Sequence, residues 1–316
     1  MKARCWATGR WATMNNPERI AIIGAGMMGN GIAAVFAARG HSVTIYDPFA
    51  EALAAAPGRV AGVLKDLSWD ADAVKRVRIE ADLAKAVADA DYVTEAILEK
   101  LPLKQDIFVQ LAAATGPDCI LASNTSVIPI TDIGAKLSDR DAARMLGTHW
   151  WNPPYLIPLV EVVQTVRTAP EPIQRTLDLL RRIGKKPVHV KRDVPGFVGN
   201  RLQHALWREA VALVDAGVCD AATVDEVIKN SFGIRLPVLA PLENADLVGL
   251  DLTQDIHDVI LKHLDRSEAP AAILREKVKK GELGMKSGKG FYDWTPESAN
   301  AVRTRVLNHL RAVLKP

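Results

Sequence analysis

The sequence contains little cysteine. Its 316 residues include three cysteines, Cys5, Cys119 and Cys219, and none of them belongs to a CxxC pair. An odd and sparse set of this kind argues against a disulfide framework and against the clustered ligands of a zinc site. We therefore expect a cytoplasmic protein, in a reducing compartment, that binds no metal.

Long apolar runs and an excess of charge are also missing. No apolar stretch approaches the ~18 residues of a membrane-spanning helix. Residues 1–16 contain basic side chains and tryptophan, but not the apolar segment of a secretory signal. The formal net charge is +3, and the basic residues are dispersed along the chain. We expect neither a membrane nor a nucleic acid as a partner.

A glycine-rich turn stands between two short apolar runs near the start of the chain. Arg19–Ile23 reads as a buried parallel strand and leads into Gly24–Gly29, a GxGxxG motif. A helical pattern follows and stops at Gly40, and Ser42–Tyr46 is a second β-branched run that ends at Asp47. This order of strand, glycine turn, helix, strand and acid is typical of dinucleotide-binding units.

Each glycine of the motif has a physical role in such a unit. Gly24 permits the tight turn, Gly26 lets the backbone approach a pyrophosphate, and Gly29 lets the helix pack closely on the strand. Met27 and Met28 complete the motif, where the helix N-terminus offers free N–H groups to phosphates. The alternative is a glycine turn between core elements that binds no ligand.

Asp47 determines which dinucleotide we expect. It stands 18 residues beyond Gly29, where a carboxylate accepts both ribose hydroxyls of the adenosine half and repels a 2′-phosphate. The sequence therefore predicts NAD rather than NADP as the cofactor.

The next segment, Glu51–Leu67, reads as a helix that Pro57-Gly58 interrupts.

Small polar residues follow another predicted strand. Cys119–Ala122 reads as a strand that runs into Ser123–Ser126, with the sequence SNTS. In an α/β sheet, ligands bind at the C-terminal ends of the strands. These side chains are candidates for a ligand site, and the alternative is that they cap the next helix.

The stretch 147–163 carries a histidine and a glutamate between two predicted strands, Arg144–Thr148 and Leu159–Val163. We expect a loop at Asn152–Pro154 to fold the second strand back beside the first and to bring Glu161 to His149. A buried carboxylate needs a partner, and a glutamate beside a histidine fixes the imidazole tautomer and suits it as a general base. The alternative is a structural histidine–glutamate pair.

A domain boundary is expected at 191–196, a polar stretch with proline and glycine, after which the pattern is helical almost throughout. We predict a disordered N-terminal extension over residues 1–17, an NAD-binding domain over 18–192 and a helical domain over 193–316. The fold class is α/β, a Rossmann-type doubly wound sheet followed by an all-α C-terminal domain.

The helical domain opens with an apolar stripe that predicts a long, largely buried helix. The stripe consists of Val198, Leu202, Leu206, Leu213 and Val214. Asn200 lies near the start of this helix, where it either faces a cleft or caps the helix end.

Six motifs together resemble one family. They are GAGMMG, EAILEKLPLK, SNTS, HWWNPP with LVEV, DVPGFVGNRL and GMKSGKGFYDW, in this order over roughly residues 18–295. They are similar to motifs of the L-3-hydroxyacyl-CoA dehydrogenases and their relatives acting on other 3-hydroxy acids. The resemblance implies an NAD-dependent oxidoreductase, with fatty acid metabolism as its setting, that forms a homodimer through the helical domain.

The resemblance also implies roles for individual residues. His149 matches the catalytic base that removes the hydroxyl proton, and Glu161 matches the residue that orients it. Ser126 and Asn200 match residues that hydrogen-bond the substrate oxygen. Three further residues match positions near the cofactor: Glu99, Lys104 and Asn124.

Two departures from the acyl-CoA members bear on the substrate. Trp150-Trp151 stands where those members usually have two phenylalanines, and Glu51–Val77 is short and poor in lysine where they carry a helical pair that grips CoA. The leading expectation is reversible oxidation of an L-3-hydroxyacyl-CoA. The main alternative is the same chemistry on a small hydroxy acid without CoA, such as carnitine, gulonate or a pyridine carboxylate.

Two further readings belong to other classes. One is an NAD-binding protein with a structural or sensing role, against which the joint presence of His149, Glu161, Ser126 and Asn200 argues. The other is a lysine-based hydroxyisobutyrate-type dehydrogenase, which needs a lysine near position 200, whereas the nearest one is Lys191.

Overall fold

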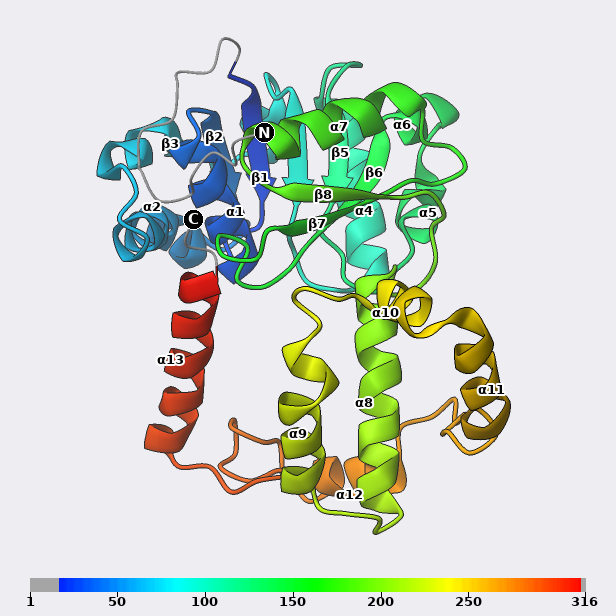
Figure 1. Cartoon of the computed structure of the whole chain (residues 1–316). Helices are drawn as coiled ribbons and strands as arrows, with labels where there is room; N and C mark the ends of the chain where they lie inside the picture. Colours follow the sequence, from blue (N-terminus) through cyan, green and yellow to red (C-terminus); the bar gives the residue numbers. More distant parts are fainter. Residues whose placement is uncertain (1–16, 314–316) are drawn as a thin grey trace. The chain divides into compact units, whose positions relative to one another are not determined.

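A computed structural model describes residues 17–313 of the chain (Figure 1). The predicted disordered extension over residues 1–17 lies, except for Pro17, outside the described residues. Of the described residues, 17–201 and 308–313 form one compact unit, and 202–307 form a second. The predicted domain limits of 18–192 and 193–316 stay a prediction.

The first unit is built on one eight-stranded sheet with the strand order β3-β2-β1-β4-β5-β6-β7-β8. The strands are β1 (Arg19–Ile23), β2 (Ser42–Tyr46), β3 (Val77–Ile79), β4 (Tyr92–Glu95), β5 (Ile120–Ser123), β6 (Met145–Trp150), β7 (Leu159–Val163) and β8 (Lys186–Val190). The strand pairs from β3 through β6 are all parallel, which requires crossover connections between them. The chain therefore has the predicted α/β, doubly wound architecture.

Helices cover both faces of this sheet because successive strand residues point to opposite sides. Ile20 and Ile22 of β1 pack in one core cluster, and Ala21 and Ile23 pack in another. The first cluster includes α1 (Met27–Ala38), α2 (Ala50–Asp66) and α7 (Pro170–Arg182). The second includes α3 (Leu83–Val87), α4 (Leu101–Ala114), α5 (Ile130–Ile133) and α6 (Asp139–Ala143). Short 3-10 segments are η1 (Ala71–Arg76) and η2 (Gly134–Lys136).

One strand pair reverses direction. β7 runs antiparallel to β6, and β8 is parallel to β7. The register of the antiparallel pair sets His149 directly opposite Glu161. The sheet itself, rather than a flexible loop, therefore brings these two side chains together.

Helix α2 corrects one expectation from the sequence. Pro57-Gly58 was expected to interrupt the helical pattern, but the helix is continuous from Ala50 to Asp66. A proline removes one backbone hydrogen bond from a helix. Packing of the apolar stripe offsets that loss, and the stripe consists of the buried residues Leu53, Ala56, Val60 and Leu64.

The second unit is helical. It contains most of α8 (Gly199–Asp215) and α13 (Pro296–Val313), together with α9 (Ala221–Asn230), η3 (Phe232–Ile234), α10 (Pro241–Val248), α11 (Leu250–Ile260) and α12 (Ala272–Lys279). No helix within residues 17–313 is both long and apolar enough to cross a membrane.

The apolar stripe of α8 was expected to be buried, and this expectation is wrong for the single chain. Leu202 is 64% exposed, and Trp207 on the same helix is 51% exposed. Many large apolar side chains of α10 and α11 are exposed as well, including Leu242, Leu247 and Leu250. The apolar periodicity of α8 predicts a face that packs against another surface. Within residues 17–313, α8, α10 and α11 have no buried residue.

Candidate active site

The glycine turn after β1 has the geometry of a phosphate-binding loop. Gly24 has a φ of +113°, and a Cβ there would lie 2.5 Å from the carbonyl oxygen of Ala96. A Cβ at Gly29 would lie 1.8 Å from the carbonyl oxygen of Gly24, so neither position accepts a side chain. A Cβ at Gly26 would meet no heavy atom within 4 Å. The backbone is therefore open at the one glycine where a pyrophosphate approaches.

Helix α1 begins directly at this turn. Gly26 is its N-cap and offers no side-chain oxygen, so the first N–H groups of the helix, at Met27 and Met28, are not capped by a side chain. Free N–H groups at a helix start favour an anion. These features fit the phosphates of NAD.

Asp47 follows β2 and reaches the same turn. One carboxylate oxygen accepts a hydrogen bond from the Ala25 amide at 2.8 Å, and the other accepts from the Phe49 amide at 2.9 Å. A carboxylate has about four acceptor positions, so two stay available for ribose hydroxyls. The carboxylate thus fixes the turn and also fits the adenosine ribose of NAD.

His149 and Glu161 form a buried pair across β6 and β7. Nδ1 of His149 lies 2.8 Å from Oε2 of Glu161, and the two residues are 4% and 1% exposed. The other carboxylate oxygen accepts from the amides of Val198 and Gly199, both at 3.0 Å. Burial alone would raise the pKa of Glu161, but hydrogen bonds from His149 and the two amides hold it below its ordinary value.

This hydrogen-bond pattern determines the tautomer of the imidazole. An ionised carboxylate only accepts hydrogen bonds, so Nδ1 of His149 carries the hydrogen that points to Glu161. Nε2 is then the lone-pair nitrogen of the neutral ring. The pair therefore presents a proton acceptor at Nε2.

Two aromatic rings lie against the imidazole. The ring centroid of Trp151 is 5.2 Å from that of His149, and the centroid of Phe197 is 5.7 Å away. Gly199 allows this packing, because a Cβ there would lie 2.4 Å from Cζ2 of Trp151. The orientation of the imidazole is thus fixed by packing as well as by Glu161.

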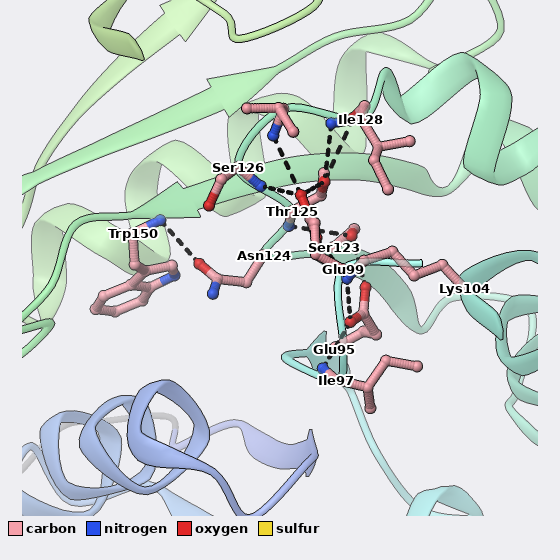
Figure 2. Close-up of polar contacts among 11 residues, drawn as sticks. Glu95, Ile97, Glu99, Lys104, Ser123, Asn124, Thr125, Ser126, Ile128 and Trp150 are labelled. Carbon is pink, nitrogen blue, oxygen red and sulfur yellow. Dashed lines mark hydrogen bonds and ion pairs between the residues drawn. The ribbon is translucent and has the colours of Figure 1, made fainter. Parts of the chain in front are cut away.

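The SNTS segment follows β5 and meets the end of β6 (Figure 2). Oδ1 of Asn124 accepts from the Trp150 amide at 2.9 Å. Nδ2 of Asn200 donates to the carbonyl oxygen of Ser126 at 2.8 Å. The structure therefore brings Ser126 and Asn200 together, and it ties Asn124 to the residue after His149.

Glu99 and Lys104 were predicted to lie near the cofactor. In the structure their charged groups form hydrogen bonds and ion pairs with other groups of the protein (Figure 2). Glu99 accepts hydrogen bonds from the Thr125 hydroxyl at 2.6 Å and the Ser126 amide at 2.8 Å. Nζ of Lys104 lies 2.6 Å from Glu95 and 3.3 Å from Glu99, and its side chain is 1% exposed. A direct contact between either residue and the cofactor stays a prediction.

Sequence reasoning missed Glu95 and the amides of Val198 and Gly199. A signal for Glu95 was present, because it is a carboxylate inside the apolar run YVTEAI, and a buried carboxylate needs a partner. Backbone amides leave no mark in a sequence. Within residues 17–313, no cluster of histidine, cysteine, aspartate and glutamate is placed to hold a metal ion.

Comparison with known proteins places both halves of the chain in one family. Residues 19–194 match the family described as 3-hydroxyacyl-CoA dehydrogenase, NAD binding domain, and residues 196–294 match 3-hydroxyacyl-CoA dehydrogenase, C-terminal domain. The chain belongs to the 3-hydroxyacyl-CoA dehydrogenase family and is an NAD-dependent oxidoreductase.

Among its relatives, 5-formyl-3-hydroxy-2-methylpyridine 4-carboxylate 5-dehydrogenase of Mesorhizobium japonicum is 38% identical over 306 residues, which cover 94% of this chain and 98% of the relative. A probable 3-hydroxybutyryl-CoA dehydrogenase of Bacillus subtilis is 37% identical over 293 residues, covering 89% and 99%. A crystal structure of a 5-formyl-3-hydroxy-2-methylpyridine 4-carboxylic acid 5-dehydrogenase, described as an NAD+-dependent dismutase, superposes with a TM-score of 0.86 at 37% identity, covering 94% of this chain and 97% of that one.

Proposed function

We propose that the protein oxidises a hydroxyl group of a small hydroxy acid that carries no CoA, with His149 as the general base. The observation that carries the reaction type is the buried His149–Glu161 pair, whose Nε2 is left as a proton acceptor. NAD, when bound, supplies the hydride acceptor for the carbon that bears the hydroxyl.

The chain's own residues then have defined tasks. Nε2 of His149 takes the hydroxyl proton, and Glu161 stabilises the imidazolium that results, because its carboxylate already accepts from Nδ1. Ser126 and Asn200 hold the substrate oxygen. Asn200 has two amide hydrogens, one of which is bonded to the Ser126 carbonyl, so the second stays available.

The basic residues between β2 and β3 support a substrate without CoA. CoA carries several phosphate charges, for which basic side chains are strong binding partners. Arg59 donates to the Ala25 carbonyl at 2.9 Å, and Arg76 donates to the Ala37 carbonyl at 3.3 Å. Lys75 is paired with Asp72 at 2.7 Å. Three of the four basic side chains of this region are therefore bonded within the protein.

The Mesorhizobium relative and the crystal structure described above support the same reading. Both are named for a pyridine carboxylate, and they match this chain over nearly its whole length. The aromatic side chain of Trp151 beside His149 suits a flat heteroaromatic substrate, because aromatic rings stack or meet edge to face. The sequence alone put the acyl-CoA substrate first, and these observations reverse that order.

A 3-hydroxyacyl-CoA is the second candidate substrate. It is supported by the family of both halves of the chain and by the Bacillus subtilis relative. The same His149–Glu161 chemistry serves either substrate, so the two candidates differ only in the binding of the remainder of the molecule.

A substrate panel separates the two candidates. NADH absorbance is followed with NAD and, in turn, carnitine, gulonate, free 3-hydroxybutyrate, 3-hydroxybutyryl-CoA and 5-formyl-3-hydroxy-2-methylpyridine 4-carboxylate, whose hydrated formyl carbon bears both a hydroxyl and the hydrogen that leaves as hydride. We expect the highest kcat/KM with one of the acids that lack CoA, at least about tenfold above the CoA ester. A higher value with 3-hydroxybutyryl-CoA overturns the proposed substrate class but leaves the proposed base intact.

We further propose that two chains form a homodimer through the helical unit. The support is the apolar surface of α8, α10 and α11, where side chains such as Leu202, Trp207 and Leu242 are exposed in the single chain. Monomeric proteins rarely expose contiguous apolar patches larger than a few hundred Å². Light scattering of the purified protein tests this, and a monomeric mass overturns it.

A further inference from the structure

A lysine lies buried between two carboxylates beside the proposed site (Figure 2). Lys104 is in the first turns of α4 and is 1% exposed. Its ammonium group is 2.6 Å from Oε1 of Glu95 and 3.3 Å from Oε2 of Glu99. Glu95 is fully buried, whereas the side chain of Glu99 is 37% exposed. A buried charge persists only where it is paired and hydrogen-bonded, so Glu95 and Lys104 depend on each other.

Both oxygens of Glu95 are engaged at the ends of two neighbouring strands. Besides Lys104, Oε1 accepts from the Ile97 amide at 2.8 Å, just beyond β4. Oε2 accepts from the Ser123 hydroxyl at 2.6 Å, at the end of β5. The Ser123 hydroxyl in turn accepts from the Thr125 amide at 3.3 Å. Glu95 therefore joins the end of β4 to the start of the SNTS segment.

Glu99 holds the other end of that segment. It accepts from the Thr125 hydroxyl at 2.6 Å, the Ser126 amide at 2.8 Å and the Val127 amide at 3.2 Å. Burial alone would raise the pKa of Glu99, but the Thr125 hydroxyl, the charge of Lys104 and the two amides hold it below its ordinary value. Glu99 is thus an anion that fixes the backbone of Ser126, and Lys104 fixes Glu99.

We propose that Glu95 is a positioning residue for Ser126, acting through Ser123 on one side and through Lys104 and Glu99 on the other. The inference rests on the proposed function, because it assumes that Ser126 binds the substrate oxygen. Two routes of charged hydrogen bonds converge on a segment that is otherwise a loop, and charged hydrogen bonds are the shorter and stronger kind. These hydrogen bonds keep Ser126 within reach of the substrate oxygen whose proton His149 takes.

The test is a double-mutant cycle between Glu95 and Ser126. Glu95→Gln keeps the size of the side chain and removes its charge. We expect this change to lower kcat/KM about tenfold or more when Ser126 is present, because small displacements of a positioning group are costly. In the Ser126→Ala background we expect the same change to alter kcat/KM by less than about threefold, since there is no hydroxyl left to position.

A matched control is available on the same helix. Asp106 of α4 pairs with Lys136 at 2.6 Å, the same separation as in the buried pair, but the side chains are 62% and 50% exposed. Asp106→Asn removes a carboxylate charge from an exposed pair, and such pairs contribute little. We expect Asp106→Asn to leave kcat/KM unchanged, both in the wild type and in the Ser126→Ala background.

A second variant keeps the test decisive if Glu95→Gln alone does not fold with a buried, unpaired Lys104. The combined change Glu95→Gln and Lys104→Met removes both buried charges. Glu99 tolerates the loss of its partner because it is partly exposed. The cycle with Ser126→Ala is then run with this combined variant, with the same expected results.

The outcomes are distinguishable. Equal losses of kcat/KM in the wild-type and Ser126→Ala backgrounds, or no loss in either, overturn the positioning role of Glu95. If Ser126→Ala and His149→Gln each keep wild-type turnover, the proposed function itself fails. A large loss from Ser126→Ala without any effect of Glu95→Gln rejects only the positioning role.

Discussion

A Cβ on Gly199 would lie 2.4 Å from Cζ2 of Trp151 and 3.3 Å from Oε2 of Glu161. The smallest side chain thus has no room where α8 begins, beside the carboxylate that binds His149. The Gly199 amide also donates to Glu161, so displacement of this backbone moves the partner of the proposed base.

We expect Gly199→Ala to lower the free energy of unfolding by about 1–3 kcal/mol, the usual cost of overpacking, and to lower kcat through the displaced Glu161. Chemical denaturation and steady-state kinetics measure the two effects. Gly62→Ala is the control, since a Cβ at Gly62 in α2 meets nothing within 4 Å and Ala favours a helix by up to about 1 kcal/mol. Equal behaviour of the two variants would contradict the packing argument.

His149→Gln should lower kcat about 10²–10⁴-fold, the loss expected when a general base is removed. Glutamine keeps a polar side chain of similar size but is not a base at neutral pH. NADH binding, followed by fluorescence titration, should stay close to that of the wild type, because the glycine turn is built from other residues. Turnover near the wild-type value would show that His149 is not the base.

Asp47→Asn should relax the preference for NAD over NADP. Asparagine still offers an oxygen to the Ala25 amide, which Asp47 binds at 2.8 Å, but it no longer repels a 2′-phosphate. We expect the ratio of kcat/KM for NADP to that for NAD to rise at least about tenfold, about 1.4 kcal/mol. The exposed Glu51, changed to Gln, is the control for loss of charge in this region. An unchanged ratio in Asp47→Asn would remove Asp47 from the cofactor site.

Lys185 should give the protein a pH-dependent stability. Burial, with a smaller contribution from the charge of Arg39, lowers its pKa to about 7, and its ammonium donates to the carbonyls of Pro154 and Ile157. In the unfolded chain the pKa of this lysine is the ordinary value of about 10.4. At a pH between these two pKa values, the unfolded chain therefore binds more protons than the folded chain. The contribution of Lys185 to the free energy of unfolding therefore rises as pH increases from about 7 towards 10.

Urea denaturation at several pH values between 7 and 9 measures this dependence. We expect Lys185→Met to flatten the rise, while Lys186→Met, which changes an exposed neighbour, leaves it in place. The same slope in Lys185→Met and in the wild type would exclude Lys185 as its source.

The sequence predicted the parts of the fold that depend on local pattern. The β-branched runs of β1, β2 and β7 were assigned with the limits that the structure has, because a buried strand needs a short, continuous apolar run. Pro57 was read as a break because a proline removes a helix hydrogen bond, but tertiary packing of α2 outweighed this local signal.

One pairing in the candidate site was predictable in the same way. His149 and Glu161 were found because a carboxylate in an apolar strand needs a partner, and the histidine lay one hairpin away. The role of Glu95 depends on Lys104, which lies on the next helix, and on Ser123, which follows a crossover. Such pairings depend on the tertiary arrangement and carry no fixed spacing in the sequence.

The antiparallel ladder between β6 and β7 also determines how the loop between these strands tolerates substitution. Because the ladder fixes His149 opposite Glu161, residues 152–158, which lie between the two strands and beyond Trp151, can change in size and polarity without shifting the register of the pair. We expect substitutions in this loop to alter substrate binding while His149 keeps its hydrogen bond to Glu161.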